Sequence, residues 1–247
     1  MVFIYFFANM FELSIIIPLY NEENLVKEVI RQVLSVPYPS SVKSFEIVVV
    51  DDCSSDNSLN VVKEMAASEP RIRIEHHEKN QGKGAAVRTG MNVAKGNVLL
   101  IQDSDLELSP SDIPAMINCM AELNVEFVNG SRYLPGVNRP LSSYKRYMAN
   151  RLFTSLTAII INVKITDMAC GYKLVHKNLL NKIRLKENRF GFEAELIIKA
   201  LRIKKNNIAE VPVRYFPRNE GEGKKLRNSD AFKIFWTILN YGLFRAN

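Results

Sequence analysis

The chain has 247 residues, 47% of them hydrophobic and 24% charged, which is ordinary for a globular protein with one large α/β domain or two small ones. Its net charge of +7 points to an anionic partner, such as nucleic acid, a phosphorylated substrate or an acidic membrane surface. The three cysteines are scattered and never form a C-x-x-C pair, which argues against a disulfide framework or zinc site and favours a reducing compartment.

Residues 1–10, MVFIYFFANM, form an apolar N-terminal extension that is about half as long as a bilayer-spanning segment. The extension lacks a basic n-region and a small-residue cleavage site, which argues against a signal peptide. Three interpretations stay open: a segment that lies on a membrane surface, an extra packed strand, or an upstream start codon with Met10 as the true beginning. Since no other segment is an unbroken apolar stretch of about twenty residues, the sequence predicts no transmembrane helix.

The first half of the chain alternates predicted strands with predicted helices. Buried-looking or alternating apolar runs predict strands at 13–20, 45–52, 71–78, 97–105 and 125–133. Helical spacing of apolar residues, together with capping serines and a terminal glycine, predicts helices at 21–36, 55–68, 82–96 and 109–123. Such alternation predicts a doubly wound, mainly parallel α/β sheet, whose ligand binds beyond the carboxyl ends of the strands.

The pattern changes after about residue 135. An apolar segment at 152–165 is predicted to begin as a helix, 189–204 is a further helix, and 208–218 is an edge strand that contains two prolines. A basic loop at 219–229 precedes an amphipathic helix whose aromatic face carries Phe232, Phe235, Trp236, Leu239 and Leu243. We therefore expect one domain over residues 1–225, followed by a C-terminal helix, 226–247, that either covers the sheet or docks on a membrane.

Acidic residues stand where three predicted strands end, at Asn21-Glu22, Asp51-Asp52 and Asp103-Ser104-Asp105. Because the carboxyl ends of parallel strands share one edge of a sheet, these acids are expected to converge on one crevice. Carboxylates at positions i and i+2 can share a hard divalent cation, with diphosphate oxygens completing its coordination. The alternative for an isolated D-x-D pattern is a solvated acidic turn.

A glycine-rich segment, NQGKGAAVRTG at 80–90, opens the third predicted helix. A helix N-terminus with a nearby lysine suits a phosphate, and Lys83 is placed to neutralise one. The segment is not a P-loop, and it follows the third strand, whereas a Rossmann glycine motif follows the first. An exposed structural turn is the alternative.

Five segments in fixed order are more specific together than any one of them: SIIIPLYNEENLV, EIVVVDDCSSDNS, NQGKGAAVRTGMNVAKGNVLLIQDSD, NGSRY and DMACGYKLV. They resemble the inverting, nucleotide-sugar-dependent glycosyltransferases of family 2, which have the GT-A fold. Within that family they most resemble the dolichyl- or polyprenyl-phosphate mannosyl- or glucosyltransferase branch, over about residues 12–225. The resemblance implies Mg²⁺- or Mn²⁺-dependent transfer of mannose or glucose from a GDP- or UDP-sugar donor to a polyprenyl or dolichyl phosphate acceptor, without a protein nucleophile.

The resemblance also implies roles for donor-side residues. Asp103 and Asp105 would hold the metal, and Glu107 would be a third ligand, although the branch commonly has an amide there. Lys83 would approach the diphosphate, and Arg218 would belong to a mobile loop that closes over the donor. The residues implied to contact the nucleoside are Pro18, Tyr20, Asn21, Glu22 and Asp52.

On the acceptor side, Arg132 and Arg146 match two arginines that hold the acceptor phosphate in that branch. Arginine suits this task because its planar guanidinium grips phosphate bidentately. Asp167 stands where many relatives carry a catalytic base or an acceptor-site acid. A hydroxyl acceptor needs such a base, whereas a phosphate is already anionic, so the role of Asp167 depends on the acceptor.

Three alternatives remain beside the leading hypothesis. A glycosyltransferase that acts on a hydroxyl of a lipid-linked or surface glycan would use Asp167 as base. A non-catalytic nucleotide-sugar-binding subunit is disfavoured by the intact Asp103 and Asp105. A nucleic-acid-binding module is disfavoured because aromatic residues do not alternate with the basic ones. A lipid acceptor implies a peripheral protein at the cytoplasmic face of a membrane, or a cytoplasmic protein. The sequence leaves open the base and the sugar of the donor and the oligomeric state of the protein.

Overall fold

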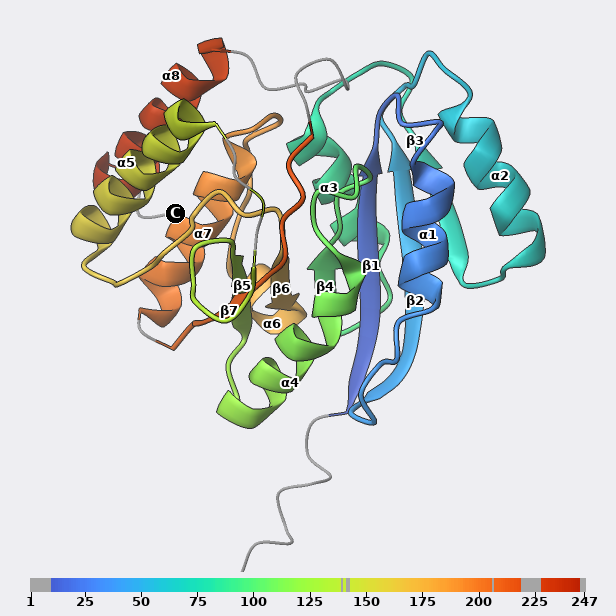
Figure 1. Cartoon of the computed structure of the whole chain (residues 1–247), viewed down its shortest axis with the longest axis horizontal. Coiled ribbons are helices and arrows are strands. Elements are labelled where there is room, and N and C mark those ends of the chain that lie inside the picture. The colour runs from blue at the N-terminus through green and yellow to red at the C-terminus, as the bar shows by residue number, and fades with distance from the viewer. Residues whose placement is uncertain (1–9, 139, 141–142, 206, 219–227, 245–247) are drawn as a thin grey trace, which may run out of the picture.

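Seven strands form a single sheet in the order β3-β2-β1-β4-β6-β5-β7 (Figure 1). A computed structural model of the chain describes residues 10–138, 140, 143–205, 207–218 and 228–244. The strands are β1 (Phe11–Leu19), β2 (Val42–Asp51), β3 (Ile72–His76), β4 (Val98–Ile101), β5 (Phe127–Ser131), β6 (Lys173–His176) and β7 (Ala209–Pro212). The predicted α/β class with a mainly parallel sheet is confirmed. The apolar extension at 1–9 and the basic loop at 219–227 lie outside the described residues.

Strand β6 is the element that the alternation of strands and helices did not predict. It pairs antiparallel with both β4 and β5, whereas the other strand pairs are parallel. Since β6 runs against β4, its first residue, Lys173, pairs with Ile101 at the carboxyl end of β4. This reversal brings the segment before β6, residues 167–172, to the edge of the sheet where the acidic strand ends lie.

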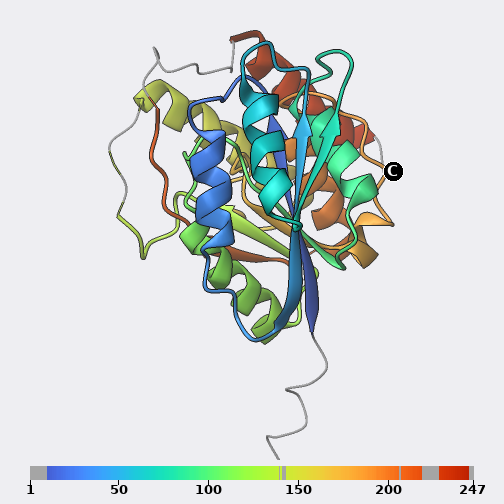
Figure 2. The ribbon, with the colours of Figure 1, turned by 90° about the vertical axis from the view of Figure 1, so that its right-hand side faces the viewer.

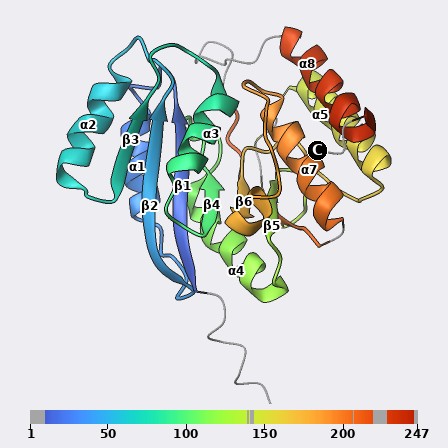
Figure 3. The ribbon, with the colours of Figure 1, turned by 180° about the vertical axis from the view of Figure 1, so that it is seen from behind.

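Helices cover both faces of the sheet, as Figures 2 and 3 show from the side and from behind. Helices α1 and α4 lie on one face, and α3 and α7 lie on the other. The helices are α1 (Val26–Leu34), α2 (Ser58–Ser68), α3 (Lys83–Val93), α4 (Ile113–Leu123), α5 (Tyr144–Ile161), α6 (Lys177–Leu180), α7 (Phe192–Lys204) and α8 (Asn228–Leu239), with short turns η1 (Pro110–Asp112) and η2 (Asn240–Phe244).

Side chains of β1 show why the central strands read as unbroken apolar runs. Ile15 and Ile17 belong to the core beneath α1 and α4, whereas Ile16 belongs to the core beneath α7. All three are fully buried. Because successive side chains of a strand point to opposite faces, a strand covered on both sides is apolar at most of its positions, as in the run Ile15–Ile17.

Helix α5 begins at Tyr144, eight residues before the apolar segment that predicted it. It packs against α7 and α8, and Figure 3 shows α5 and α8 together at one end of the molecule. On α8 and η2, Ile234, Ile238 and Tyr241 are buried in the core on the α7 face. The C-terminal helix is therefore integrated into the domain on one side and not a separate unit.

The opposite side of α8 faces solvent. Phe232 is 71% exposed and Trp236 is 59% exposed, so these rings do not cover the sheet. Exposed apolar side chains also follow one face of α5, at Tyr144, Met148, Leu152 and Ile159. None of the helices in the described ranges is long and apolar enough to cross a membrane.

Candidate active site

The acids at the strand ends meet at one edge of the sheet, as the sequence predicted. Arg218 joins two of them: its Nη1 lies 3.0 Å from Glu22 Oε2, after β1, and its Nη2 lies 3.3 Å from Asp105 Oδ2, after β4. Left-handed backbone occurs two residues beyond the end of β1, with φ of 51° at Asn21, and two residues beyond the end of β2, with φ of 62° at Cys53. In the loop after β4, Leu106 has φ of 57° and lies between Asp105 and Glu107.

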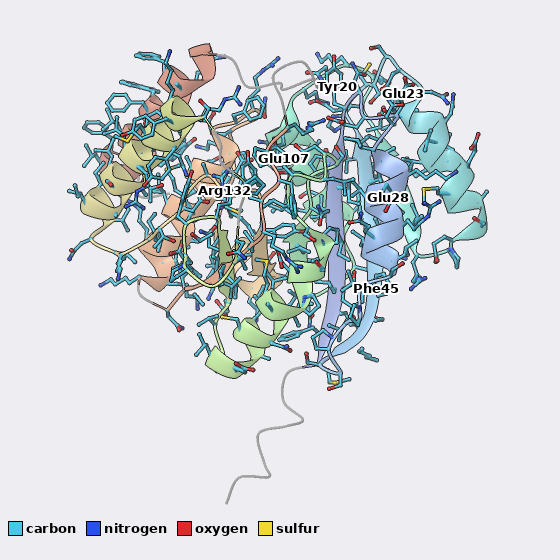
Figure 4. The ribbon with its side chains drawn as sticks, viewed as in Figure 1. Tyr20, Glu23, Glu28, Phe45, Glu107 and Arg132 are labelled. Carbon is cyan, nitrogen blue, oxygen red and sulfur yellow. The ribbon has the colours of Figure 1, made fainter. Side chains whose placement is uncertain are left out.

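The loop after β1 is tied to the loop after β2. The Asn21 N–H donates to Ser54 Oγ at 3.0 Å, and Asn21 Oδ1 accepts from the Ser55 N–H at 2.8 Å. The Glu22 N–H donates to Ser58 Oγ at 2.8 Å. Pro18 is paired with β2, and Tyr20 lies at the end of β1 (Figure 4). The loop expected to bind the nucleoside is thus ordered by contacts with its neighbour.

Asp52 holds the glycine-rich loop. Its carboxylate accepts hydrogen bonds from the backbone N–H groups of Gln81 and Gly82, at 2.8 and 2.7 Å, and lies 2.7 Å from His77 Nδ1. Asp52 is 3% exposed. Its contacts fix the start of α3 relative to β2, and its contact with a base stays a prediction.

The preceding residue, Asp51, braces its own turn. Asp51 Oδ2 accepts from the Ser54 N–H at 3.2 Å and lies 2.9 Å from His76 Nδ1. The adjacent histidines His76 and His77 therefore each contact one of the adjacent aspartates, because β2 and β3 run parallel with Asp51 opposite His76. Their ring nitrogens support the loops and form no metal site with the residues described.

Lys83 lies between two carboxylates at the start of α3. Its Nζ is 2.7 Å from Asp103 Oδ1 and 2.7 Å from Glu193 Oε1. Burial alone would lower the pKa of Lys83, but the charges of Asp103 and Glu193 more than offset it and raise the pKa above its ordinary value. Lys83 is therefore charged. The sequence reasoning missed Glu193, because an acid in the first turn of a helix has an ordinary local role.

Burial raises the pKa of the Asp105 carboxyl to about 6, and the negative charges of Asp103 and Glu107 add to this shift, against the opposing effect of Arg218. Three carboxylates, those of Asp103, Asp105 and Glu107, are thus close enough to affect one another. Such a group of negative charges suits an added cation.

Glu107 contacts the segment that leads into the basic loop. Its Oε2 accepts from the Tyr215 hydroxyl at 3.2 Å, and its Oε1 accepts from the Arg218 N–H at 3.0 Å. Among the residues that the structure describes, no three His, Cys, Asp or Glu side chains form a group able to hold a metal ion. The predicted set of Asp103, Asp105 and Glu107 is thus not assembled as three ligands, and Glu107 instead ties residues 215–218 to the acidic loop.

Arg132 and Asp167 form a buried ion pair on the other side of β6. Arg132 Nε lies 2.7 Å from Asp167 Oδ2, Arg132 Nη2 lies 2.9 Å from Oδ1, and the Arg132 N–H donates to Oδ2 at 3.0 Å. Asn150 Nδ2 donates to Oδ1 at 2.9 Å. Asp167 is 0% exposed, and its four acceptor positions are occupied.

The electrostatics of this pair follow from its burial. Burial alone would raise the pKa of Asp167, but the charge of Arg132 and hydrogen bonds from Arg132 and Asn150 hold the pKa below its ordinary value. Burial would lower the pKa of Arg132, but Asp167 raises it well above the ordinary value. Both groups are ionised, and the Arg132 charge is held in a fixed direction.

Arg146 lies on the first turns of α5 and is half-buried. Its neighbour Tyr147 contacts the ring of Tyr133, beside Arg132, with centroids 5.4 Å apart. The two arginines expected at the acceptor side therefore belong to elements that touch.

Tyr215 connects the two sides of the site. Its hydroxyl donates to Glu107 on the donor side, and its ring lies 5.1 Å from the Arg132 guanidinium carbon. Figure 4 shows Glu107 and Arg132 near the middle of the molecule and Tyr20 at the upper end of β1. No sequence motif marked Tyr215, since an aromatic residue in an extended segment is ordinary.

The DMACGYK segment supports both sides. At Gly171 a Cβ atom would lie 2.2 Å from Asp103 Oδ2, so any larger residue here would force the Asp103 carboxylate to move. The buried Lys173 Nζ donates to Asn129 Oδ1 and to the carbonyl oxygens of Met168 and Cys170. Burial raises the pKa of the Cys170 thiol to about 12, so it is no thiolate nucleophile.

The chain is similar to known sugar-transferring proteins. The sequence profile described as "Glycosyl transferase family 2" matches residues 14–184. Dolichyl-phosphate beta-glucosyltransferase ALG5D of Trichomonas vaginalis is 31% identical over 245 residues, which cover 94% of this chain and 73% of that protein. Dodecaprenyl-phosphate galacturonate synthase of Rhizobium johnstonii is 26% identical, covering 94% and 67%. Glycosyltransferase AglD of Haloferax volcanii is 23% identical and is a longer protein, of which this chain spans 37%.

Solved structures support the fold. Glucosyl-3-phosphoglycerate synthase from Mycobacterium tuberculosis, in complex with uridine diphosphate, superposes with a TM-score of 0.71 at 18% identity, covering 94% of this chain and 80% of that one. A structure of the same synthase with Mn²⁺, uridine diphosphate and phosphoglyceric acid gives a TM-score of 0.71 at 19% identity. At identities this low, the likeness shows the architecture alone. What it does not show, the substrate and the metal, has to be argued from the residues described above.

Proposed function

The chain belongs to glycosyl transferase family 2, and we propose that it transfers a hexose, mannose or glucose, from a GDP- or UDP-sugar to the phosphate of a polyprenyl or dolichyl lipid. One observation carries this proposal: a guanidinium held in place by a buried carboxylate adjoins the acidic edge, connected to it through Tyr215. The edge supplies a site for the donor and its cation, and the fixed arginine supplies a site for an anionic acceptor. The names of the relatives in Trichomonas and Rhizobium support the lipid phosphate.

The donor side suits a divalent cation. Asp103 and Asp105 offer the hard carboxylate oxygens that Mg²⁺ and Mn²⁺ prefer, and Mg²⁺ is commonly held by one or two carboxylates plus substrate phosphates. The neighbouring negative charges of Asp103, Asp105 and Glu107 fit that donor set. When bound, the cation would neutralise charge on the departing diphosphate. Lys83, charged and held by Asp103, adds positive charge from the protein itself.

The acceptor side supports a phosphate over a hydroxyl. A hydroxyl acceptor needs a base, but the Asp167 carboxylate is fully buried, has a lowered pKa and accepts hydrogen bonds at both oxygens. A phosphate acceptor needs no base, because its oxygens are already anionic. We propose that Asp167 orients Arg132, and that Arg132 and Arg146 hold the acceptor phosphate.

The proposed step is a single displacement. An oxygen of the acceptor phosphate forms a bond to the anomeric carbon while the bond between that carbon and the diphosphate oxygen breaks. The nucleoside diphosphate leaves with the electron pair, and the configuration at the anomeric carbon inverts. Residues of the chain orient the two phosphates and stabilise charge, and no covalent enzyme intermediate forms.

The exposed apolar faces of α5 and α8 suit contact with a membrane. Phe232 and Trp236 on α8 and Leu152 and Ile159 on α5 are exposed, and the two helices pack against each other. Lys145 and Lys233 lie exposed on the same helices and suit anionic headgroups. We propose that these faces form a peripheral contact with the cytoplasmic side of a membrane, where a lipid acceptor would be presented.

The experiment that tests the function is a transfer assay with a panel of nucleotide sugars that includes GDP-mannose and UDP-glucose. Each donor is incubated with a short-chain polyprenyl phosphate, in Mg²⁺, in Mn²⁺ and in EDTA. Cation-dependent formation of a glycosyl-phospholipid with one donor is the expected result. Transfer to the corresponding polyprenol but not to its phosphate would overturn the choice of acceptor, and no turnover with any donor would overturn the reaction.

A further inference from the structure

Helix α5 reaches the buried ion pair through one side chain, Asn150. Its Nδ2 donates to Asp167 Oδ1 at 2.9 Å, and the same oxygen accepts from Arg132 Nη2 at 2.9 Å. Three segments therefore meet at one carboxylate: the end of β5 through Arg132, the loop before β6 through Asp167, and α5 through Asn150. Asn150 is 9% exposed, and its side-chain hydrogen bond within the described residues goes to Asp167, not to the acidic edge or the donor-side cations.

The same contact sets the rotation of α5. Arg146 lies four residues before Asn150, so both side chains emerge from one face of the helix, about one turn apart. When Asn150 is bonded to Asp167, that face is turned toward the ion pair. The contact between the Tyr147 and Tyr133 rings adds a second connection to the loop that follows β5. Asn150 thus relates the position of Arg146 to that of Arg132.

The buried amide carries a cost that an apolar residue would avoid. Asn150 Oδ1 is buried and has no hydrogen-bond partner within the part of the chain that the structure describes. An unsatisfied buried acceptor destabilises a fold, whereas an apolar side chain of similar volume can be neutral or stabilising. Holding Asp167 through Nδ2 is a task that only the polar side chain performs, and it offsets this cost.

We propose that Asn150 is a positioning residue for the acceptor phosphate, acting through Asp167 on Arg132 and through the face of α5 on Arg146. The proposal rests on the proposed function, because it requires that the two arginines bind a phosphate. Asn150 does not itself touch the acceptor. It fixes the carboxylate that directs the Arg132 guanidinium and holds the helix that carries the second arginine.

The main test compares Asn150→Leu with the wild-type chain. Leucine has a similar volume, removes the bond to Asp167 and removes the unsatisfied oxygen. We expect the thermal unfolding midpoint to change little, because removing the unsatisfied oxygen offsets the lost bond to Asp167. The KM for a short-chain polyprenyl phosphate should rise about tenfold, the usual effect of losing one hydrogen bond to a charged group. The KM for the donor and the rate of donor hydrolysis should change less than about twofold. A purely structural role would instead shift stability and both substrates together.

Thr157→Val is the matched control on the same helix. Thr157 is fully buried, and its hydroxyl contacts Met168 Sδ at 3.3 Å, not Asp167. The substitution changes one buried polar group of α5 and is expected to leave the acceptor KM unchanged. An acceptor KM that rises equally in Thr157→Val and Asn150→Leu would contradict a specific role for Asn150.

A double substitution tests whether Asn150 acts through the arginine. In an Arg132→Ala background, Asn150→Leu should cost less acceptor affinity than it does in the wild-type chain, because only its effect on Arg146 remains. If the two losses multiply, or if Asn150→Leu alone leaves the acceptor KM unchanged, the proposal is wrong. Asn150→Ser is the second variant, used if the leucine variant does not fold, with the same expected split between acceptor and donor.

Direct binding separates this proposal from the proposed reaction. Calorimetric titration with farnesyl phosphate needs no turnover, and the wild-type chain should bind it more tightly than Asn150→Leu by about tenfold. Binding without sugar transfer would overturn the reaction and still support the role of Asn150. Failure of the wild-type chain to bind farnesyl phosphate would overturn both, because no phosphate would then be held by the arginines.

Discussion

Two arginine–carboxylate clusters lie on the same edge of the sheet, and they differ in how firmly the cation is held. Arg218 binds Glu22, whose side chain is 7% exposed, and Asp105, whose side chain is 23% exposed. Arg132 binds Asp167, which is 0% exposed and fixed by a second donor, Asn150. Breaking a buried pair leaves an uncompensated charge, whereas a partly exposed pair can exchange partners with solvent and ligands at lower cost.

The difference between the clusters matches two different tasks. A donor arrives with its own cation and leaves as a nucleoside diphosphate. The negative charges around Asp105 must therefore be compensated differently before and after the donor binds. An acceptor phosphate needs one direction of approach, which a guanidinium clamped by a buried carboxylate provides. Tyr215 contacts both clusters, through Glu107 and Arg132, and so links the exchangeable side to the fixed one.

The largest expected effect is on the exchangeable cluster, from Asp105→Asn. Loss of this carboxylate should reduce sugar transfer about a thousandfold in a steady-state assay, since charge stabilisation of the leaving group is a dominant catalytic effect. The fold should not suffer at neutral pH. The pKa of Asp105 is raised to about 6 in the folded chain, above its ordinary value, so ionisation destabilises the fold above that pH.

Thermal unfolding tests the expectation that Asp105→Asn does not weaken the fold. Asp105→Asn is expected to unfold at a higher temperature than the wild-type chain at pH 7.5, and the difference should vanish near pH 4, where the wild-type carboxyl is protonated. A variant that unfolds at a lower temperature at pH 7.5 would show that Asp105 supports the fold, and its lost activity would then say nothing about the donor.

Asp167→Asn tests the fixed cluster, with the next largest effect. The substitution leaves the buried Arg132 charge uncompensated, which should lower the free energy of unfolding by about 3–5 kcal/mol. The pKa of Asp167 is lowered in the folded chain, so its stabilisation is present above the unfolded pKa, near 4, and is lost only below it. Chemical denaturation of both chains at pH 7 and at pH 3.5 checks this.

Kinetics of the same variant distinguish orientation from base catalysis. If Asp167 orients Arg132, acceptor KM should rise about a hundredfold at neutral pH, while nucleotide binding survives. If Asp167 were a base, kcat would collapse with acceptor KM unchanged. A collapse of kcat with unchanged acceptor KM would contradict the distinction between the two clusters, because both would then act on the chemical step.

Arg218→Ala tests whether the Arg218 guanidinium and a divalent cation compete for the same carboxylates. Removing a guanidinium 3.3 Å from Asp105 should let the free chain bind Mn²⁺ about tenfold more tightly, since one competing positive charge is gone. Electron paramagnetic resonance of Mn²⁺ measures this without turnover. Arg214→Ala is the control, because Arg214 lies nearby in sequence but pairs with Asp112. Unchanged Mn²⁺ affinity in Arg218→Ala would mean that Arg218 and the cation do not compete.

The smallest effect on chemistry is expected from the exposed aromatic residues. Replacing Phe232 and Trp236 by serine should reduce co-sedimentation with anionic phospholipid vesicles about fivefold, because two exposed rings are removed from the interface. Transfer to a water-soluble short-chain acceptor should be unchanged. Leu123→Ser is the control, since Leu123 is 59% exposed, as Trp236 is, but lies on α4. Equal loss of vesicle binding in the control would contradict a specific membrane face.

Much of the donor side could be predicted from the sequence, because its signals are local. The run from Ile15 to Leu19 is apolar at every position since β1 is covered on both faces, and Glu22 follows at its end. Asp103 and Asp105 stand in the same relation to β4. Parallel strands place such residues at a common edge, so the convergence of the acids follows from the pattern of strands alone.

The sequence predicted which residues belong to the acceptor side but not how they contact one another. Arg132 and Asp167 are 35 residues apart in the chain, and whether Asp167 is a base or a clamp depends on its complete burial. Its burial in turn depends on β6, an antiparallel strand that the alternation of strands and helices did not predict. Asn150 was not predicted at all, because a polar residue on an apolar helix has no distinctive local pattern.

The sequence by itself determined the α/β order, the acidic strand ends and the family, because each rests on periodicity or on residues close together in the chain. Tertiary structure alone decided which charges meet. Arg218 binds Glu22 across 196 residues, and Tyr215 binds Glu107 across 108. Such partners are selected by how sheets and helices pack, and a charged or aromatic side chain looks the same in sequence whichever partner it finally contacts.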